Sequence, residues 1–64
     1  MNMTIAREII NRCDNVSINR IRSYGYTKGE LLSACRYIDA RKFSTNDERK
    51  RADILYWKIV FYWE

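Results

Sequence analysis

The sequence predicts an all-α fold, a compact bundle of three to four short helices formed by a single helical domain over residues 1–64. Proline is absent and only two glycines occur among the 64 residues, a composition that favours helices over a turn-rich β fold. Apolar residues also recur at helical spacing in four segments, each preceded by a residue that can cap a helix. A chain of this length is near the lower limit for folding without disulfides, metals or a partner subunit.

The first two expected helices are short. The first covers about residues 4–13, with Thr4 as its N-cap. Its apolar face consists of Ile5, Ile9, Ile10 and Cys13. The second helix follows Ser17, which caps it, and ends at Gly25, because glycine adopts the left-handed conformation that terminates helices. Its apolar pair is Ile18 and Ile21.

The third expected helix opens with a capping box, in which Thr27 and Glu30 exchange side-chain and backbone hydrogen bonds. It is expected to end near Lys42. Its broad apolar face consists of Leu31, Leu32, Ala34, Cys35 and Ile38. Together with residues from the other helices, this face predicts a core made of Ile5, Ile9, Cys13, Ile18, Ile21, Leu31, Ala34, Cys35, Ile38, Leu55 and Ile59.

The fourth expected helix covers about residues 46–62 and has the strongest start signal in the chain. Ser44 or Thr45 can cap it, and two acidic residues follow at the positive end of the helix dipole. The segment 54–63 is rich in aromatic and β-branched residues, so a C-terminal strand is the alternative. A helix is favoured because the cap leads directly into it and a lone strand has no partner in this chain.

Two apolar stripes run along this fourth helix when residues are placed at about 100° intervals. The first stripe consists of Ala52, Tyr56, Ile59 and Trp63, with Leu55 and Tyr62 at its edge. The second, on nearly the opposite side, consists of Ile54, Trp57 and Phe61. Two interpretations are open for the second stripe. Either the helix is central and covered on both sides, or the stripe binds a protein partner or a second copy in a homodimer, since tryptophan is enriched in interface hot spots.

The charge distribution suggests nucleic acid as an alternative partner. The net charge of +4 lies entirely in residues 1–45, which hold eight basic and four acidic side chains. A helix-turn-helix within residues 17–42 would use Thr27–Lys42 as its recognition helix. The residues that would face DNA are Arg20, Arg22, Thr27, Lys28, Ser33 and Arg36. Two positions disagree with the motif, because Ile21 is large for close helix packing and Leu32 would point toward DNA.

Several function classes lack the residues they need. Histidine is absent, which removes the commonest general base and metal ligand. No glycine-rich phosphate loop or Gly-x-Ser-x-Gly motif occurs, so we expect no enzyme, no catalytic residues, no cofactor and no metal. The longest apolar run, residues 54–63, is about half the length of a membrane span. With no secretory segment at the N-terminus, we expect a cytoplasmic protein whose Cys13 and Cys35 are apolar core residues, with a disulfide as the alternative.

The function that these patterns favour is that of a small, non-enzymatic regulator acting by stoichiometric binding to a protein partner, as an inhibitor or adaptor. In size and composition the chain resembles the accessory regulators of phages and plasmids, a resemblance that assigns no residues. A helix-turn-helix transcriptional regulator is the alternative. The mixed-charge run 47–53 is interpreted as a solvated helix face with near-neighbour ion pairs.

Overall fold

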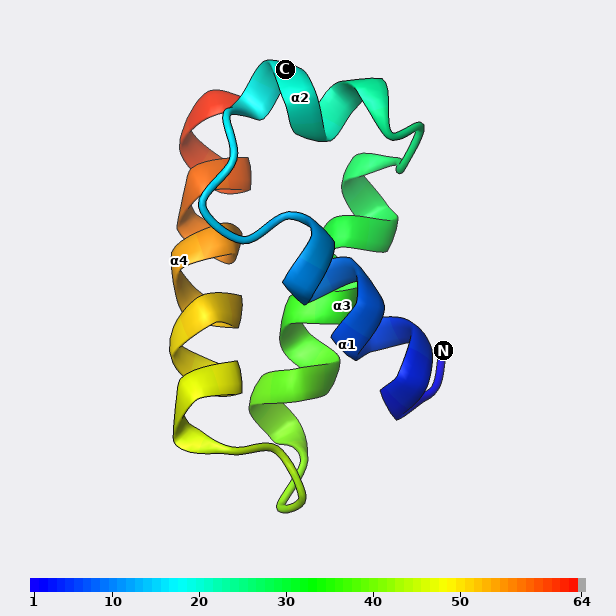
Figure 1. The fold of residues 1–64 in the computed structure, drawn as a ribbon, viewed down its shortest axis with the longest axis vertical. Helices are drawn as coiled ribbons and strands as arrows, with labels where there is room; N and C mark the ends of the chain where they lie inside the picture. The colour runs from blue at the N-terminus through cyan, green and yellow to red at the C-terminus, as the bar shows by residue number, and fades with distance from the viewer. Residues whose placement is uncertain (64) are drawn as a thin grey trace.

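A computed structural model describes residues 1–63 and contains four helices: α1 (Met3–Arg12), α2 (Ile18–Ser23), α3 (Lys28–Ala40) and α4 (Asn46–Tyr62) (Figure 1). The all-α prediction is confirmed. The strand alternative for the C-terminal segment is wrong, because the helix that begins at Asn46 continues through the β-branched and aromatic residues to Tyr62.

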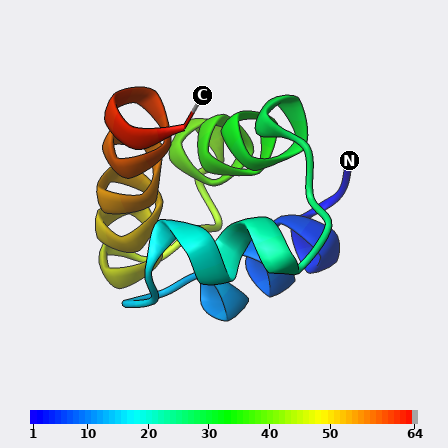
Figure 2. The same ribbon diagram turned by 90° about the horizontal axis from the view of Figure 1, so that it is seen from above.

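The two longest helices, α3 and α4, run antiparallel side by side, and α1 packs across both of them (Figures 1 and 2). The short helix α2 crosses one end of this layer. Its helix-to-helix contacts go to α4 and not to α3. A helix-turn-helix needs its first helix packed on the recognition helix, so the described arrangement does not confirm that motif within residues 17–42.

The helix starts follow the capping residues closely, with one correction. The side chains of Ser17 and Thr27 cap α2 and α3 as predicted, and of the two caps predicted for α4 the structure uses Thr45. Thr27 and Thr45 form complete capping boxes. Thr4 is not the N-cap of α1, because Asn2 accepts the Ile5 N–H at 2.9 Å and the helix begins earlier. At the other ends, α3 stops at Ala40, two residues before the predicted limit.

The backbone turn after α2 forms at the expected glycine. Gly25 has a φ of 86°, a conformation that residues with a Cβ rarely adopt. Asn15, in the connection between α1 and α2, also has a positive φ of 56°. Asparagine is one of the few other residues that tolerate this region.

The core lies where the inner faces of α1, α3 and α4 meet, with Ile21 closing it from α2. Its buried members are Ala6, Ile9, Ile10, Cys13, Ile21, Leu31, Ala34, Cys35, Ile38, Ala52, Leu55 and Ile59. Two predicted members differ: Ile5 is 46% exposed, and Ile18 is only partly buried at the edge. The buried face of α1 is rotated toward the small side chain of Ala6, which repeats with Ile9, Ile10 and Cys13 at helical spacing.

Both cysteines are free and buried, in agreement with their interpretation as core residues. Burial raises the pKa of the Cys13 thiol. Burial, together with the nearby Cys13, raises the pKa of Cys35 to about 12. Because the thiolate is the reactive form, neither side chain is suited to nucleophilic chemistry at neutral pH.

Candidate protein-binding face and groove

The second apolar stripe of α4 points away from the core. Ile54 is 53% exposed, Trp57 49% and Phe61 71%. On the opposite side of the same helix, Ala52, Leu55 and Ile59 are at most 3% exposed. The interpretation that α4 is central and covered on both sides is therefore wrong. We refer to Ile54, Trp57 and Phe61 as the aromatic face.

The rings of the aromatic face form an ordered platform. Trp57 and Phe61 are stacked, with ring centroids 5.7 Å apart and planes 26° from parallel. Tyr56 meets Trp57 edge-on at 5.3 Å and 89°. Such contacts fix the rings relative to one another before any partner binds. Sequence patterns missed two neighbours, since Val60 and Tyr62 are also exposed at this end of the chain.

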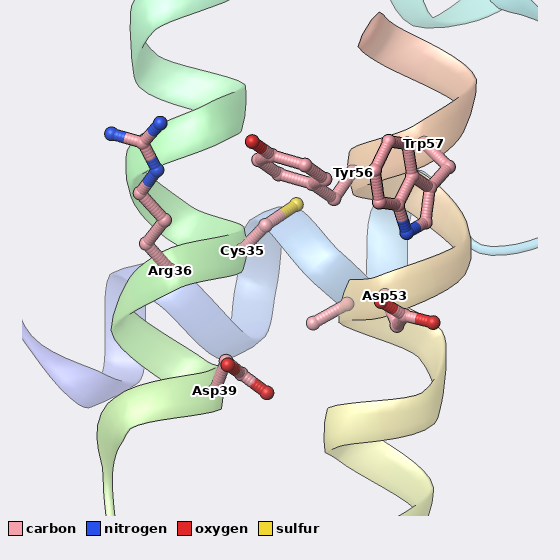
Figure 3. Close-up of a pocket in the computed structure, with 7 residues that line it drawn as sticks. Cys35, Arg36, Asp39, Asp53, Tyr56 and Trp57 are labelled. Atoms are coloured by element: carbon pink, nitrogen blue, oxygen red, sulfur yellow. The ribbon is translucent and has the colours of Figure 1, made fainter.

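A hollow of about 210 Å³ lies beside the aromatic face, between α3 and α4 (Figure 3). The buried residues Ala52 and Cys35 form its base. Its other lining residues are Arg36, Asp39, Asp53, Tyr56 and Trp57. Trp57 therefore belongs to both features, and the hollow continues the aromatic face toward α3. The sequence did not predict this groove, because it depends on how two distant helices pair.

The residues proposed for nucleic acid are spread over different surroundings. Thr27 uses its side chain to cap α3. Arg22 donates a hydrogen bond to the Tyr62 carbonyl at 3.3 Å, with its guanidinium 5.2 Å from the Trp63 ring. The Arg36 guanidinium lies 5.9 Å from the Tyr56 ring, at the edge of the groove. All six residues, including Arg20, Lys28 and Ser33, are exposed.

Other arginines also pack on this protein's own aromatic rings and polar groups. The Arg12 guanidinium lies 4.5 Å from the Tyr24 ring, and that of Arg41 lies 4.1 Å from the Tyr37 ring. The near-neighbour ion pairs predicted for the segment 47–53 do not form within residues 1–63, because Glu48 pairs with Arg7 of α1 and Arg51 donates to the side chain of Asn11 on α1. Much of the basic charge therefore connects or covers helices.

The start of α4 is tied to α1 by an ion pair. The Arg7 Nε atom donates to a carboxylate oxygen of Glu48 at 2.6 Å, and the other oxygen of Glu48 accepts the Thr45 N–H. The backbone hydrogen bond from Thr45, followed by the one from Arg7, lowers the pKa of Glu48. This contact fixes the end of α4 opposite the aromatic face.

Within residues 1–63, no group of three or more His, Cys, Asp or Glu side chains is placed to hold a metal ion. No helix in that range is both long enough and apolar enough to span a membrane. Comparison with family models, curated proteins and solved structures gave no significant match.

Proposed function

We propose that this protein is a small, non-enzymatic regulator that binds a protein partner stoichiometrically through the aromatic face of α4. The observation that carries the proposal is that Trp57 and Phe61 stack on each other in an exposed position. An inhibitor or an adaptor would use such a face to occupy a surface of its target.

The energetics of burial support this role. An exposed tryptophan and phenylalanine on a helix of a 64-residue chain leave large apolar surfaces in water. A fully covered aromatic side chain buries on the order of 150–250 Å², and Trp57 and Phe61 still expose 49% and 71% of their surface. Tryptophan is enriched among interface residues whose truncation costs about 2 kcal/mol or more. Because the two rings are already ordered by stacking, little of their own side-chain entropy is lost when a partner covers them.

The described contacts favour a protein over DNA as the partner. Phosphate recognition depends on basic side chains that reach outward from one surface. In this fold, Arg22 and Arg36 lie against aromatic rings, and Thr27 is occupied by its capping role. The stacked rings of the aromatic face, in contrast, leave Trp57 49% and Phe61 71% exposed and open to a partner's apolar surface.

The experiment is a pull-down from native cell lysate with the tagged chain, run with and without nuclease. The variant Trp57→Ala/Phe61→Ala is compared with the wild type, and with Ile5→Ala/Phe43→Ala, which removes two exposed apolar side chains outside α4. We expect one discrete protein that survives nuclease, is retained by the control variant and is lost with the aromatic double variant. Circular dichroism should show unchanged helicity.

Two other results would contradict the proposal. Recovery of nucleic acid, with no protein left after nuclease, would move the function to the basic residues of α2 and α3. Sedimentation of the purified chain as a tight dimer that the double variant converts to monomer would make the aromatic face a contact between two copies instead.

A further inference from the structure

The groove beside the aromatic face differs in charge from the rest of this basic protein. Asp39 on α3 and Asp53 on α4 both line it and are exposed. Within residues 1–63 neither carboxylate forms an ion pair, although the chain carries 12 Lys and Arg side chains; the ion pair that does form joins Arg7 and Glu48. Arg36 also lines the groove, and its side chain extends along α3 away from Asp39, with its guanidinium carbon 5.9 Å from the centre of the Tyr56 ring (Figure 3).

The size of the hollow indicates what can enter it. Its volume of about 210 Å³ is below the roughly 300–1,000 Å³ of typical small-molecule sites. A single long side chain is a better match than a metabolite. The base is small and apolar at Ala52, and the wall is aromatic at Tyr56 and Trp57, so the stem of that side chain would meet apolar surface while its end meets carboxylates.

We infer that the groove receives an arginine side chain from the same partner protein that covers the aromatic face, so that the partner's docking segment carries an arginine next to its apolar anchor. This inference rests on the proposed function. A guanidinium is planar, stacks on aromatic rings and pairs with carboxylates. The protein already places its own arginines in this way, since Arg12, Arg22 and Arg41 each lie over a ring.

The charge of the lining, two aspartates against one arginine, disfavours an anionic occupant. Asp39 and Asp53 repel an acidic side chain, whereas Arg36, held at the Tyr56 end, leaves the carboxylate end available to a cation. Trp57 is shared between the groove and the aromatic face, so one segment can contact both features. The arginine would determine the position of the partner along α4 as well as contribute affinity.

The test is a titration of the isotope-labelled protein with N-acetyl-arginine methylamide, followed by NMR. N-acetyl-glutamate methylamide is the matched anionic probe. We expect saturable shifts that are confined to Asp39, Asp53 and the Trp57 indole, are absent with the glutamate probe and diminish as salt is added. In Asp39→Asn/Asp53→Asn the affinity should fall roughly three- to tenfold. The control Glu8→Gln/Asp14→Asn makes the same change in net charge at two exposed acids outside the groove.

The inference is overturned if the arginine probe gives no saturable shift, if the glutamate probe gives the same shifts, or if the two neutralised variants behave alike. Phe61 is outside the groove lining and Asp39 is outside the aromatic face, so the two proposals fail separately. If binding of the partner is lost with Phe61→Ala but is unchanged in Asp39→Asn/Asp53→Asn, the proposed function is supported and the arginine inference is rejected. If the partner binds the Phe61→Ala variant as well as the wild type, the proposed function is rejected, whatever the probe titration shows.

Discussion

The two sides of α4 have similar side chains but very different surroundings. Ile59 on the inner side is fully buried, whereas Ile54 on the outer side, little more than one turn earlier in the same helix, is 53% exposed. The larger aromatic residues, Trp57 and Phe61, are on the exposed side. Hydrophobicity therefore does not identify which stripe holds the fold together. The buried fraction of the side chains does identify it, because the inner stripe is covered and the outer stripe is left available for binding.

The most direct test of this difference is to truncate one isoleucine on each side of α4. Ile59→Ala should destabilise the fold by about 2–5 kcal/mol, because it removes buried methylene groups and leaves a cavity. A domain of this size has little more stability than that to lose. Ile54→Ala should cost less than about 1 kcal/mol. Urea unfolding followed by circular dichroism measures both, and equal losses would show that α4 is covered on its outer side.

Thiol labelling extends the comparison to the rest of the core. Because Cys13 and Cys35 are buried and their pKa values are raised, alkylation by iodoacetamide at pH 8 should require unfolding. We expect it to be at least roughly a hundredfold slower than in urea. The added thiol of Ile54→Cys should react at the rate of a free cysteine. Mass spectrometry separates the three sites, and rapid native labelling of Cys35 would contradict the described core.

Variants of the N-terminal cap test how much the stability of α4, which carries both stripes, depends on its first turn. Thr45 accepts the Glu48 N–H at 3.1 Å, so Thr45→Ala should cost about 1 kcal/mol. Thr45→Ser keeps the hydroxyl and should remain near the wild type. Thermal unfolding gives the difference. If Thr45→Ala has no effect on stability, packing alone determines where α4 begins.

The smallest expected effect is the acid sensitivity contributed by Glu48. Its pKa is lowered in the folded state by the Thr45 and Arg7 hydrogen bonds. Its contribution is therefore fully present above the unfolded pKa and is lost as pH falls through the folded pKa. Because the Arg7 side chain is 42% exposed, we expect this contribution to be below about 1 kcal/mol. Denaturant titrations from pH 6 to 3 should show a smaller decline for Glu48→Gln than for the wild type; identical declines would exclude the contact.

Much of the local structure could be predicted from particular residues. The capping boxes at Thr27 and Thr45 and the glycine at position 25 fixed helix limits to within about two residues, because these signals act over neighbouring positions. Prediction was less accurate for α1, where Asn2 and Thr4 are both acceptable caps. In the structure Asn2 is the cap, and α1 is rotated so that Ala6 is buried and Ile5 is 46% exposed.

The sequence alone determined that this chain is helical, where α2, α3 and α4 begin, and that α4 carries two apolar stripes. Those properties come from capping, glycine placement and helical periodicity, which are local. Only the tertiary structure decided whether the second stripe is covered as well, because that depends on where α1 and α3 lie against α4. The groove lined by Asp39, Asp53 and Trp57 also depends on the packing of α3 against α4, since its lining comes from both helices.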